Sequence, residues 1–188
     1  GVFTNKNTYI CVELSQSIMI AKIVDKVLKW MIPDSTWRIN DTDGVYLTFD
    51  DGPTPGVTEW ILSILERYDA KATFFVLGKN VELYPDLYQK IIEAGHKIGN
   101  HTYSHQKGWA MSTERYIEDV DLAGDMLHTE LFRPPYARIT RTQLQQIAQR
   151  YRIVMWNVLS RDYNRHLSPK KCLRETIRGL RGGDIISL

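Results

Sequence analysis

The chain has 188 residues, of which 43% are hydrophobic and 24% charged, the composition of an ordinary globular domain with a substantial core. A formal net charge of +2, without a long block of Lys and Arg, gives no support for a nucleic-acid partner. No apolar segment reaches the length of a membrane span, so no transmembrane segment is expected. Cys11 and Cys172 match no metal or redox motif and are expected to be free thiols.

Residues 1–43 are interpreted as an N-terminal extension, and residues 44–188 as one domain. Apolar residues at helical spacing from Ile18 to Ile32, interrupted by lysines, predict an amphipathic helix that packs on the domain, with a membrane-surface role as the alternative. The extension has no basic stretch followed by an apolar run, so no intact signal peptide is visible. A signal removed before residue 1 would leave no trace.

From residue 45 onward, short apolar runs alternate with amphipathic segments. This alternation predicts parallel strands and an α/β architecture, and both a barrel and a doubly wound sheet fit it. Strands are expected over residues 45–49, 72–77, 97–99, 131–132, 152–158 and 184–188. Helices are expected over residues 55–68, 85–94, 112–127, 140–150 and 169–180.

Two adjacent carboxylates, Asp50 and Asp51, end the first apolar run, directly before Gly52-Pro53. They fit a solvated turn, because Asp-Gly is a frequent turn pair. They also fit a reactive site, in which one acid binds a metal and the other takes a proton from water activated by the metal.

His101 and His105 follow a later strand end and are four residues apart. On a helical turn this spacing places both imidazoles on one face, which suits two ligands of one metal. Two histidines with Asp51 or Asp50 would form an open metal site, for which Zn²⁺ is the first choice and Co²⁺, Mn²⁺ or Fe²⁺ also fit.

Arg133-Pro134-Pro135-Tyr136 follows the next predicted strand. A cation here would keep a neighbouring carboxylate ionised, although a surface salt bridge is the simpler role for Arg133. The prolines fix a rigid loop, which can hold the backbone N–H of Tyr136 towards a developing oxyanion.

Together these stretches resemble the polysaccharide deacetylases, the NodB-homology domains of carbohydrate esterase family 4. The resemblance runs from about Val45 to Leu188. Its main motifs are Thr48-Phe49-Asp50-Asp51-Gly52-Pro53, His101-Thr102-Tyr103-Ser104-His105 and Arg133-Pro134-Pro135-Tyr136.

The resemblance implies a distorted (β/α) barrel that removes acetyl groups from an amino sugar of an acetylated polysaccharide, such as peptidoglycan or a chitin-type glycan. Acetylated xylan is the less frequent substrate of the family. A cell-surface or periplasmic location follows only from that substrate, and the oligomeric state stays open.

The resemblance also implies a role for each site residue. Asp50 is the catalytic base; Asp51, His101 and His105 are the metal ligands. Arg133 pairs with the base, and the N–H of Tyr136, in a loop with Pro135, holds the oxyanion. Trp156 lines the acetyl pocket, unless it only packs in the core, and Asp162 tunes the catalytic acid.

The chain departs from the family pattern at a few positions. Leu159 stands where an acid is common, Tyr163 where a tryptophan is common, and Ala137 where a glycine is usual. The resemblance implies that the family's catalytic acid, a histidine, would directly follow Leu188, and that the last helix and strand of the barrel are missing from this sequence. A truncated sequence, a disordered tail or a cleaved chain would each explain this. Without that histidine, a non-catalytic domain that binds metal and glycan is the alternative.

Overall fold

The computed structural model describes residues 27, 30, 32–40 and 43–188. The chain divides into two compact units, residues 1–33 and residues 34–188. Most of the amphipathic helix predicted for residues 18–32 lies outside the described residues, as does Cys11, whereas Cys172 is a free thiol. The second unit contains every predicted site residue, and its architecture follows.

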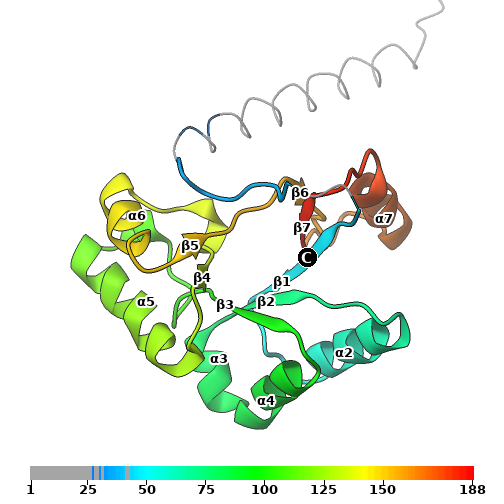
Figure 1. The fold of residues 1–188 in the computed structure, drawn as a ribbon, viewed down its shortest axis with the longest axis horizontal. Coiled ribbons are helices and arrows are strands. Elements are labelled where there is room, and N and C mark those ends of the chain that lie inside the picture. The colour runs from blue at the N-terminus through cyan, green and yellow to red at the C-terminus, as the bar shows by residue number, and fades with distance from the viewer. Residues whose placement is uncertain (1–26, 28–29, 31, 41–42) are drawn as a thin grey trace, which may run out of the picture. The chain divides into compact units, whose positions relative to one another are not determined.

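A parallel sheet of seven strands forms the centre of this unit, in the order β5-β4-β3-β2-β1-β7-β6. The sheet curls, and the helices lie around its outer side, so that the unit forms a half-barrel (Figure 1). The predicted distorted (β/α) barrel is therefore confirmed, and the doubly wound sheet is not the fold. The strands are β1 (Tyr46–Asp50), β2 (Thr73–Val76), β3 (Lys97–Asn100), β4 (Leu131–Phe132), β5 (Arg152–Ile153), β6 (Val158–Leu159) and β7 (Ile185–Ser187).

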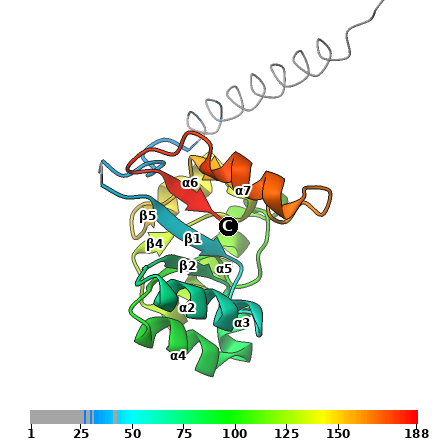
Figure 2. The same cartoon turned by 90° about the vertical axis from the view of Figure 1, so that its right-hand side faces the viewer.

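The helices begin where the sequence supplies caps. Ser112, Thr140 and Ser168 each accept a hydrogen bond from a backbone N–H in the first turn of the helix that follows. The helices are α2 (Val57–Arg67), α3 (Gly78–Leu83), α4 (Pro85–Glu93), α5 (Thr113–Leu127), α6 (Arg141–Ile147) and α7 (Pro169–Ile177), with short 3₁₀ turns η1 (Gly108–Ala110) and η2 (Pro135–Ala137). Figure 2 shows α2 and α4 side by side on the outer surface. Of the described helices, none has the length and apolarity needed to cross a bilayer.

A buried apolar cluster joins β2 to the helices outside it. Phe75 and Val76, on neighbouring positions of β2, are both fully buried, as expected for a parallel strand covered on both faces. This packing fixes β2, the strand that directly precedes α3. The cluster consists of Leu65, Ala72, Phe74, Val76, Val81, Ile91, Ala123 and Leu127.

The structure differs from the predicted elements in two places. Helix α3 was not predicted, because it begins directly after β2 without a capping side chain. The strand predicted over residues 152–158 is divided into β5 and β6. The reason lies between them: the carbonyl groups of Val154 and Met155 accept hydrogen bonds from the guanidinium of Arg133, at 3.0 Å each.

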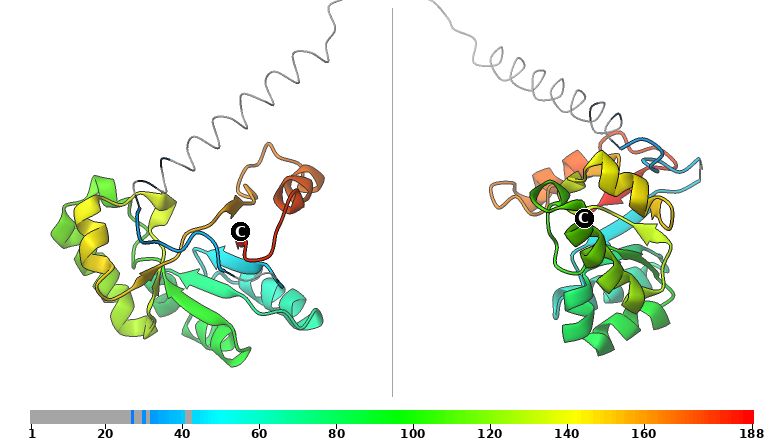
Figure 3. Two further views of the ribbon diagram at one scale, coloured as in Figure 1. Left: turned by 45° about the horizontal axis from the view of Figure 1, so that its top comes forward. Right: turned by 90° about the vertical axis from the view of Figure 1, so that its left-hand side faces the viewer.

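Residues 34–40 lie along the chain that connects β5 and β6 (Figure 3). Thr36 forms a parallel bridge with Val154, and Arg38 an antiparallel bridge with Asp184. The Arg38 guanidinium is also paired with the Asp184 carboxylate, with 3.1 Å between Nε and Oδ1. This segment therefore connects the region beyond β5 to the start of β7.

Candidate active site at the carboxyl ends of the strands

The predicted site residues follow strand ends that meet at one edge of the sheet. Asp50 ends β1, His101 directly follows β3, and Arg133 directly follows β4. Because all the strands are parallel, their carboxyl ends lie on the same side, where barrel enzymes carry their chemistry.

Asp51, His101 and His105 form the group of side chains that can hold a metal ion, with one ligand atom from each within 4.8 Å of the others. Asp51 Oδ1 lies 3.4 Å from His101 Nε2 and 3.0 Å from His105 Nε2. Ligand atoms in a tetrahedral zinc site lie roughly 3.3 Å apart, given metal–ligand distances of about 2.0–2.1 Å. Both the spacing and the donor set therefore fit a divalent metal.

The two histidines meet through a loop and not through the expected helical turn. Thr102 and His105 have φ angles of 69° and 61°, so the chain turns by left-handed residues. Asn100 fixes the start of this loop, because its Oδ1 accepts a hydrogen bond from the Thr102 N–H at 2.8 Å. The imidazole rings of His101 and His105 still meet, with 5.2 Å between their centroids.

The orientation of His101 suits metal binding. Its Nδ1 lies 2.7 Å from the carbonyl oxygen of Arg133, so a proton on Nδ1 would be donated there and Nε2 would keep its lone pair towards Asp51. Burial lowers the pKa of His101, against the attraction of Asp50 and Asp51. The neutral imidazole, which is the form that binds metals, is thereby favoured.

Asp51 is held open to solvent in an ionised state. Burial acts to raise the pKa of Asp51, but the hydrogen bond from His105 and the charges of His101, His105 and Lys79 outweigh it and lower the pKa. The backbone at Asp51 has a φ of 71°, and its carbonyl accepts a hydrogen bond from Asn80 Nδ2 in α3 at 2.7 Å. The helix missed from sequence therefore helps to position a predicted ligand.

Asp50 directly precedes Asp51, one of the three residues that can hold a metal ion, and pairs with Arg133. Arg133 Nη1 donates to Asp50 Oδ1 at 2.7 Å, and the Arg133 side chain is completely buried, whereas 18% of that of Asp50 is exposed. A buried guanidinium needs such a partner, so the pair is far from an exposed salt bridge. The simple surface role considered for Arg133 is excluded.

Thr48 and Ser187 belong to the same polar network and were not singled out from sequence. Arg133 Nη1 also donates to Thr48 Oγ1 at 2.7 Å, and Ser187 Oγ donates to Asp50 Oδ2 at 3.0 Å. Both are buried hydroxyl residues within strands. A polar side chain at a buried strand position was the available signal, since buried polar groups need partners.

Trp156 lies at the same buried cation. The Arg133 guanidinium carbon is 4.0 Å from the ring centroid of Phe75 and 5.4 Å from that of Trp156. Both rings therefore lie within cation–π distance of the guanidinium, while its N–H groups donate to oxygen atoms.

The loop after Arg133 places Tyr136 against a predicted metal ligand. The ring centroids of Tyr136 and His105 are 4.7 Å apart. The N–H groups of Ala137 and Arg138 bond to the carbonyls of Pro134 and the buried Pro135, and neither bond uses the N–H of Tyr136. Ala137 has a φ of 54°, a conformation that favours the glycine usual at this position.

Asp162 is the predicted site residue that these contacts do not include. It lies in the exposed loop after β6, where the Ser160 hydroxyl donates to its Oδ1 at 2.5 Å. In the described part of the chain, the hydrogen bonds of Asp162 join it to Ser160 alone.

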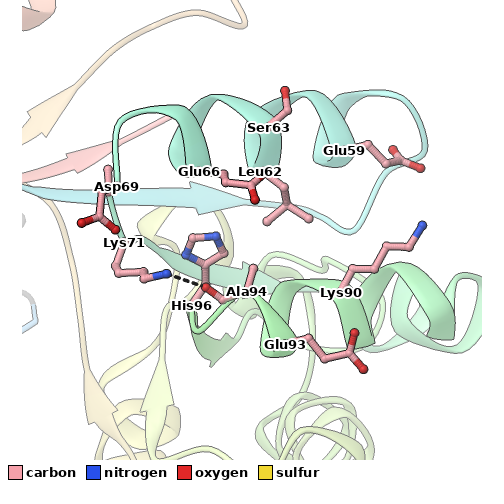
Figure 4. Close-up of a pocket in the computed structure, with 11 residues that line it drawn as sticks. Glu59, Leu62, Ser63, Glu66, Asp69, Lys71, Lys90, Glu93, Ala94 and His96 are labelled. Atoms are coloured by element: carbon pink, nitrogen blue, oxygen red, sulfur yellow. Dashed lines mark hydrogen bonds between the residues drawn. The ribbon is translucent and has the colours of Figure 1, made fainter.

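A separate pocket between α2 and α4 contains none of the predicted site residues (Figure 4). Lys71 Nζ donates to the Ala94 carbonyl at 2.8 Å, and the buried ring of His96 accepts from the Ala72 N–H at 3.4 Å. Lys71 and His96 thus join neighbouring segments of the backbone. The candidate active site is therefore assigned to the strand ends and not to this pocket.

A half-barrel of parallel strands with carboxylates and histidines at its carboxyl edge defines a (β/α) barrel enzyme. The family model described as polysaccharide deacetylase matches residues 38–155. The chain belongs to the polysaccharide deacetylase family.

Two curated relatives are both peptidoglycan-N-acetylglucosamine deacetylases of Bacillus cereus. One is 38% identical over 63% of this chain and 46% of its own length, and the other 31% identical over 81% and 76%. The chain thus spans less than half of the first. A solved peptidoglycan N-acetylglucosamine deacetylase, with a bound benzamide derivative, has a TM-score of 0.77 and 31% identity, over 82% of this chain and 75% of that one.

Proposed function

We propose that the protein is a metal-dependent hydrolase that removes N-acetyl groups from N-acetylglucosamine units of a polysaccharide. The observation that carries this proposal is the division of labour between adjacent acids: Asp51 faces two imidazoles, whereas Asp50 is turned to Arg133 and Ser187. The family and the names of its relatives support N-deacetylation as the reaction.

Asp51, His101 and His105 would hold the metal, with Zn²⁺ as the first choice. A bound divalent metal supplies a Lewis acid, which polarises the acetyl carbonyl and lowers the pKa of water. Asp51 is 59% exposed, which leaves the group open to water and substrate.

Asp50 would act as the general base that takes a proton from the attacking water. Its two oxygens each accept one hydrogen bond, and a carboxylate oxygen has a second lone pair for a further proton donor. Arg133 donates to this carboxylate and orients it. The N–H of Tyr136, in a loop whose neighbouring N–H groups are already bonded, would donate to the oxyanion of the tetrahedral intermediate.

The test is acetate release from N-acetylglucosamine oligomers, with and without added Zn²⁺. We expect Asp50→Asn to lower kcat by about 10²–10⁴-fold, the usual contribution of a general base, while bound zinc stays stoichiometric. His101→Ala should lose zinc and activity together, because it removes a buried ligand. Unchanged turnover in Asp50→Asn would contradict the assignment of the base.

Two other outcomes would change the proposed function. Zinc binding without acetate release from any glycan would favour a domain that binds metal and glycan without catalysis. Release from acetylated xylan alone would favour an O-acetyl esterase of the same fold.

A further inference from the structure

This inference rests on the proposed function and narrows its substrate. We propose that the site selects glycan strands whose sugars carry carboxylate groups, and that Lys107 and Arg138 recognise these carboxylates. We call these two side chains, with the rings of Tyr136 and Trp109 beside them, the cationic rim.

The ring of Tyr136 contacts both Lys107, the first cation of the rim, and His105 of the proposed metal site. Lys107 Nζ lies 5.1 Å from the ring centroid of Tyr136, and that ring is 4.7 Å from the ring of His105. Lys107 is exposed, and Tyr136 is 54% exposed. A sugar next to the reacting N-acetyl group would therefore lie within reach of this ammonium group.

The second cation lies further along the same loops. The guanidinium carbon of Arg138 is 5.8 Å from the ring centroid of Trp109. The indole N–H of Trp109 donates to the Ile139 carbonyl at 2.8 Å, which fixes a large ring that remains 53% exposed. An exposed, fixed aromatic ring offers an apolar surface to the face of a sugar ring.

A buried side chain, that of Gln143, helps to fix the two loops that carry the cationic rim. Gln143, which is fully buried, donates from Nε2 to the Gly108 carbonyl at 2.9 Å. The Gly108 N–H donates to the Arg138 carbonyl at 2.8 Å, which joins the two loops. The backbone that carries both cations is therefore fixed before substrate binds, and less ordering free energy opposes binding.

No carboxylate of the described residues forms an ion pair with Lys107 or Arg138. Two acids are bonded to the loop that precedes Lys107: Asp119 accepts from the Ser104 hydroxyl, and Glu82 from the hydroxyl of Tyr103. A carboxylate from outside is thus the complementary partner, and Arg can bind it through two parallel hydrogen bonds.

This charge distinguishes between the two N-acetylated glycans that the proposed function allows. A strand of N-acetylglucosamine alone is neutral and gains nothing from the cationic rim. A strand in which every second sugar carries a free lactyl carboxylate, as in peptidoglycan from which the peptides have been removed, offers an anion beside each neutral N-acetyl sugar.

The experiment compares kcat/KM for acetate release from three substrates: neutral N-acetylglucosamine oligomers, peptidoglycan strands stripped of peptides, and strands that keep them. The variants are Lys107→Gln, Arg138→Gln and their combination. Lys90→Gln is the matched control, because Lys90 is an exposed lysine that lines the pocket between α2 and α4.

We expect the wild type to prefer the stripped acidic strand, and this preference to weaken as salt is added. The double variant should reduce the ratio of acidic to neutral kcat/KM about tenfold, mainly through KM, given the strength of exposed charged contacts. Lys90→Gln should leave the ratio unchanged.

Equal losses on the acidic and neutral strands, or an unchanged ratio, would overturn the inference. So would a preference seen only for strands that keep their peptides, because the carboxylate would then not be that of the sugar. Failure of the proposed function is a different result, namely no acetate release by the wild type from any of the three substrates.

Discussion

Single hydroxyl groups contribute to the alignment of the candidate base. Ser187 donates its hydroxyl to Asp50 Oδ2, on the side opposite to Arg133. The carboxylate is thereby held from both of its oxygens. Such hydrogen bonds to an ionised group are worth more than those between neutral groups.

We expect Ser187→Ala to lower kcat by about tenfold, since a charge-assisted hydrogen bond contributes about 1.5–3 kcal/mol and part of this aligns the base. Zinc affinity should hardly change, because Asp50 is not among the proposed ligands. Steady-state kinetics and a zinc titration of the same preparations test this. A parallel fall in zinc affinity would show that Ser187 supports the fold of the site and not the base.

A buried histidine outside the site makes stability depend on pH. Burial, together with the nearby charge of Lys71, lowers the pKa of His96 below its ordinary value of 6.5. In the pH range between 6.5 and the lowered pKa, the unfolded chain binds a proton that the folded chain does not. Stability from this group is therefore present above pH 6.5 and is lost as the pH falls below it.

We expect chemical denaturation of the wild type to show a free energy of unfolding that falls between pH 7 and pH 5. The share of His96 is at most about 1.4 kcal/mol per pH unit. His96→Asn, whose side-chain oxygen can still accept from the Ala72 N–H, should show a shallower decrease. Other titrating groups are common to both proteins, so equal slopes would contradict this role of His96.

At the scale of elements, Gly99 lets β3 pack closely against Phe75, whose ring contacts the buried guanidinium of Arg133. A Cβ atom added at Gly99 would lie 2.3 Å from the ring of Phe75, and that ring contacts the Arg133 guanidinium. Phe75 is fixed in β2, and Arg133 is fixed by its buried hydrogen bonds, so neither side chain can move aside freely.

Gly99→Ala should therefore lower the free energy of unfolding by about 1–3 kcal/mol, the usual cost of overpacking a core, and should also reduce activity through Arg133. Gly44→Ala is the matched control, because a Cβ there meets nothing within 4 Å. Thermal denaturation and acetate release measure both effects. A change of equal size in the control would refute the packing argument.

The order of strands and helices was predictable because hydrophobic periodicity and capping residues are local signals. Strand Leu131–Phe132 is as predicted, and the helix expected over residues 112–127 begins directly after the cap at Ser112. Helix α3 and the division of residues 152–158 were not predictable in this way. The first has no capping side chain, and the second depends on Arg133, which is distant in sequence.

The residues of the candidate site were easier to predict from the sequence than the geometry in which they meet. Asp51, His101 and His105 do form one group, but a loop with left-handed residues brings them together. Backbone turns of this kind leave little trace in residue types other than glycine. A polar residue in a buried strand indicates that Thr48 and Ser187 need partners, but their partners lie on distant strands and are not identified by a local pattern.

At the scale of the whole unit, residues 34–40 complete the half-barrel. Thr36 exchanges hydrogen bonds of 2.8 Å with the backbone of Ile153 and Met155, and the Ile39 N–H donates to the Gly183 carbonyl at 2.9 Å. With the ion pair of Arg38, these contacts join the segment after β5, at one edge of the sheet, to the start of β7, which is next to β6 at the opposite edge.

We expect a protein that starts at Gly44 to be about 3 kcal/mol less stable than one that starts at Asp34, at about 1 kcal/mol for each backbone hydrogen bond lost. For a chain of this size, this corresponds to a Tm lower by about 6–12 °C. Calorimetry of the two truncated proteins, which share all candidate site residues, measures the difference. Equal Tm values would show that the segment adds nothing to stability.

The bridge at Thr36 also has a consequence for the order in which the chain matures. The partners of this segment, Val154 and Asp184, are synthesised more than a hundred residues after it. Contacts between such distant parts of a chain form slowly, because closing a long loop is entropically costly. The contacts of residues 34–40 can therefore be complete only after the chain has been translated as far as Asp184.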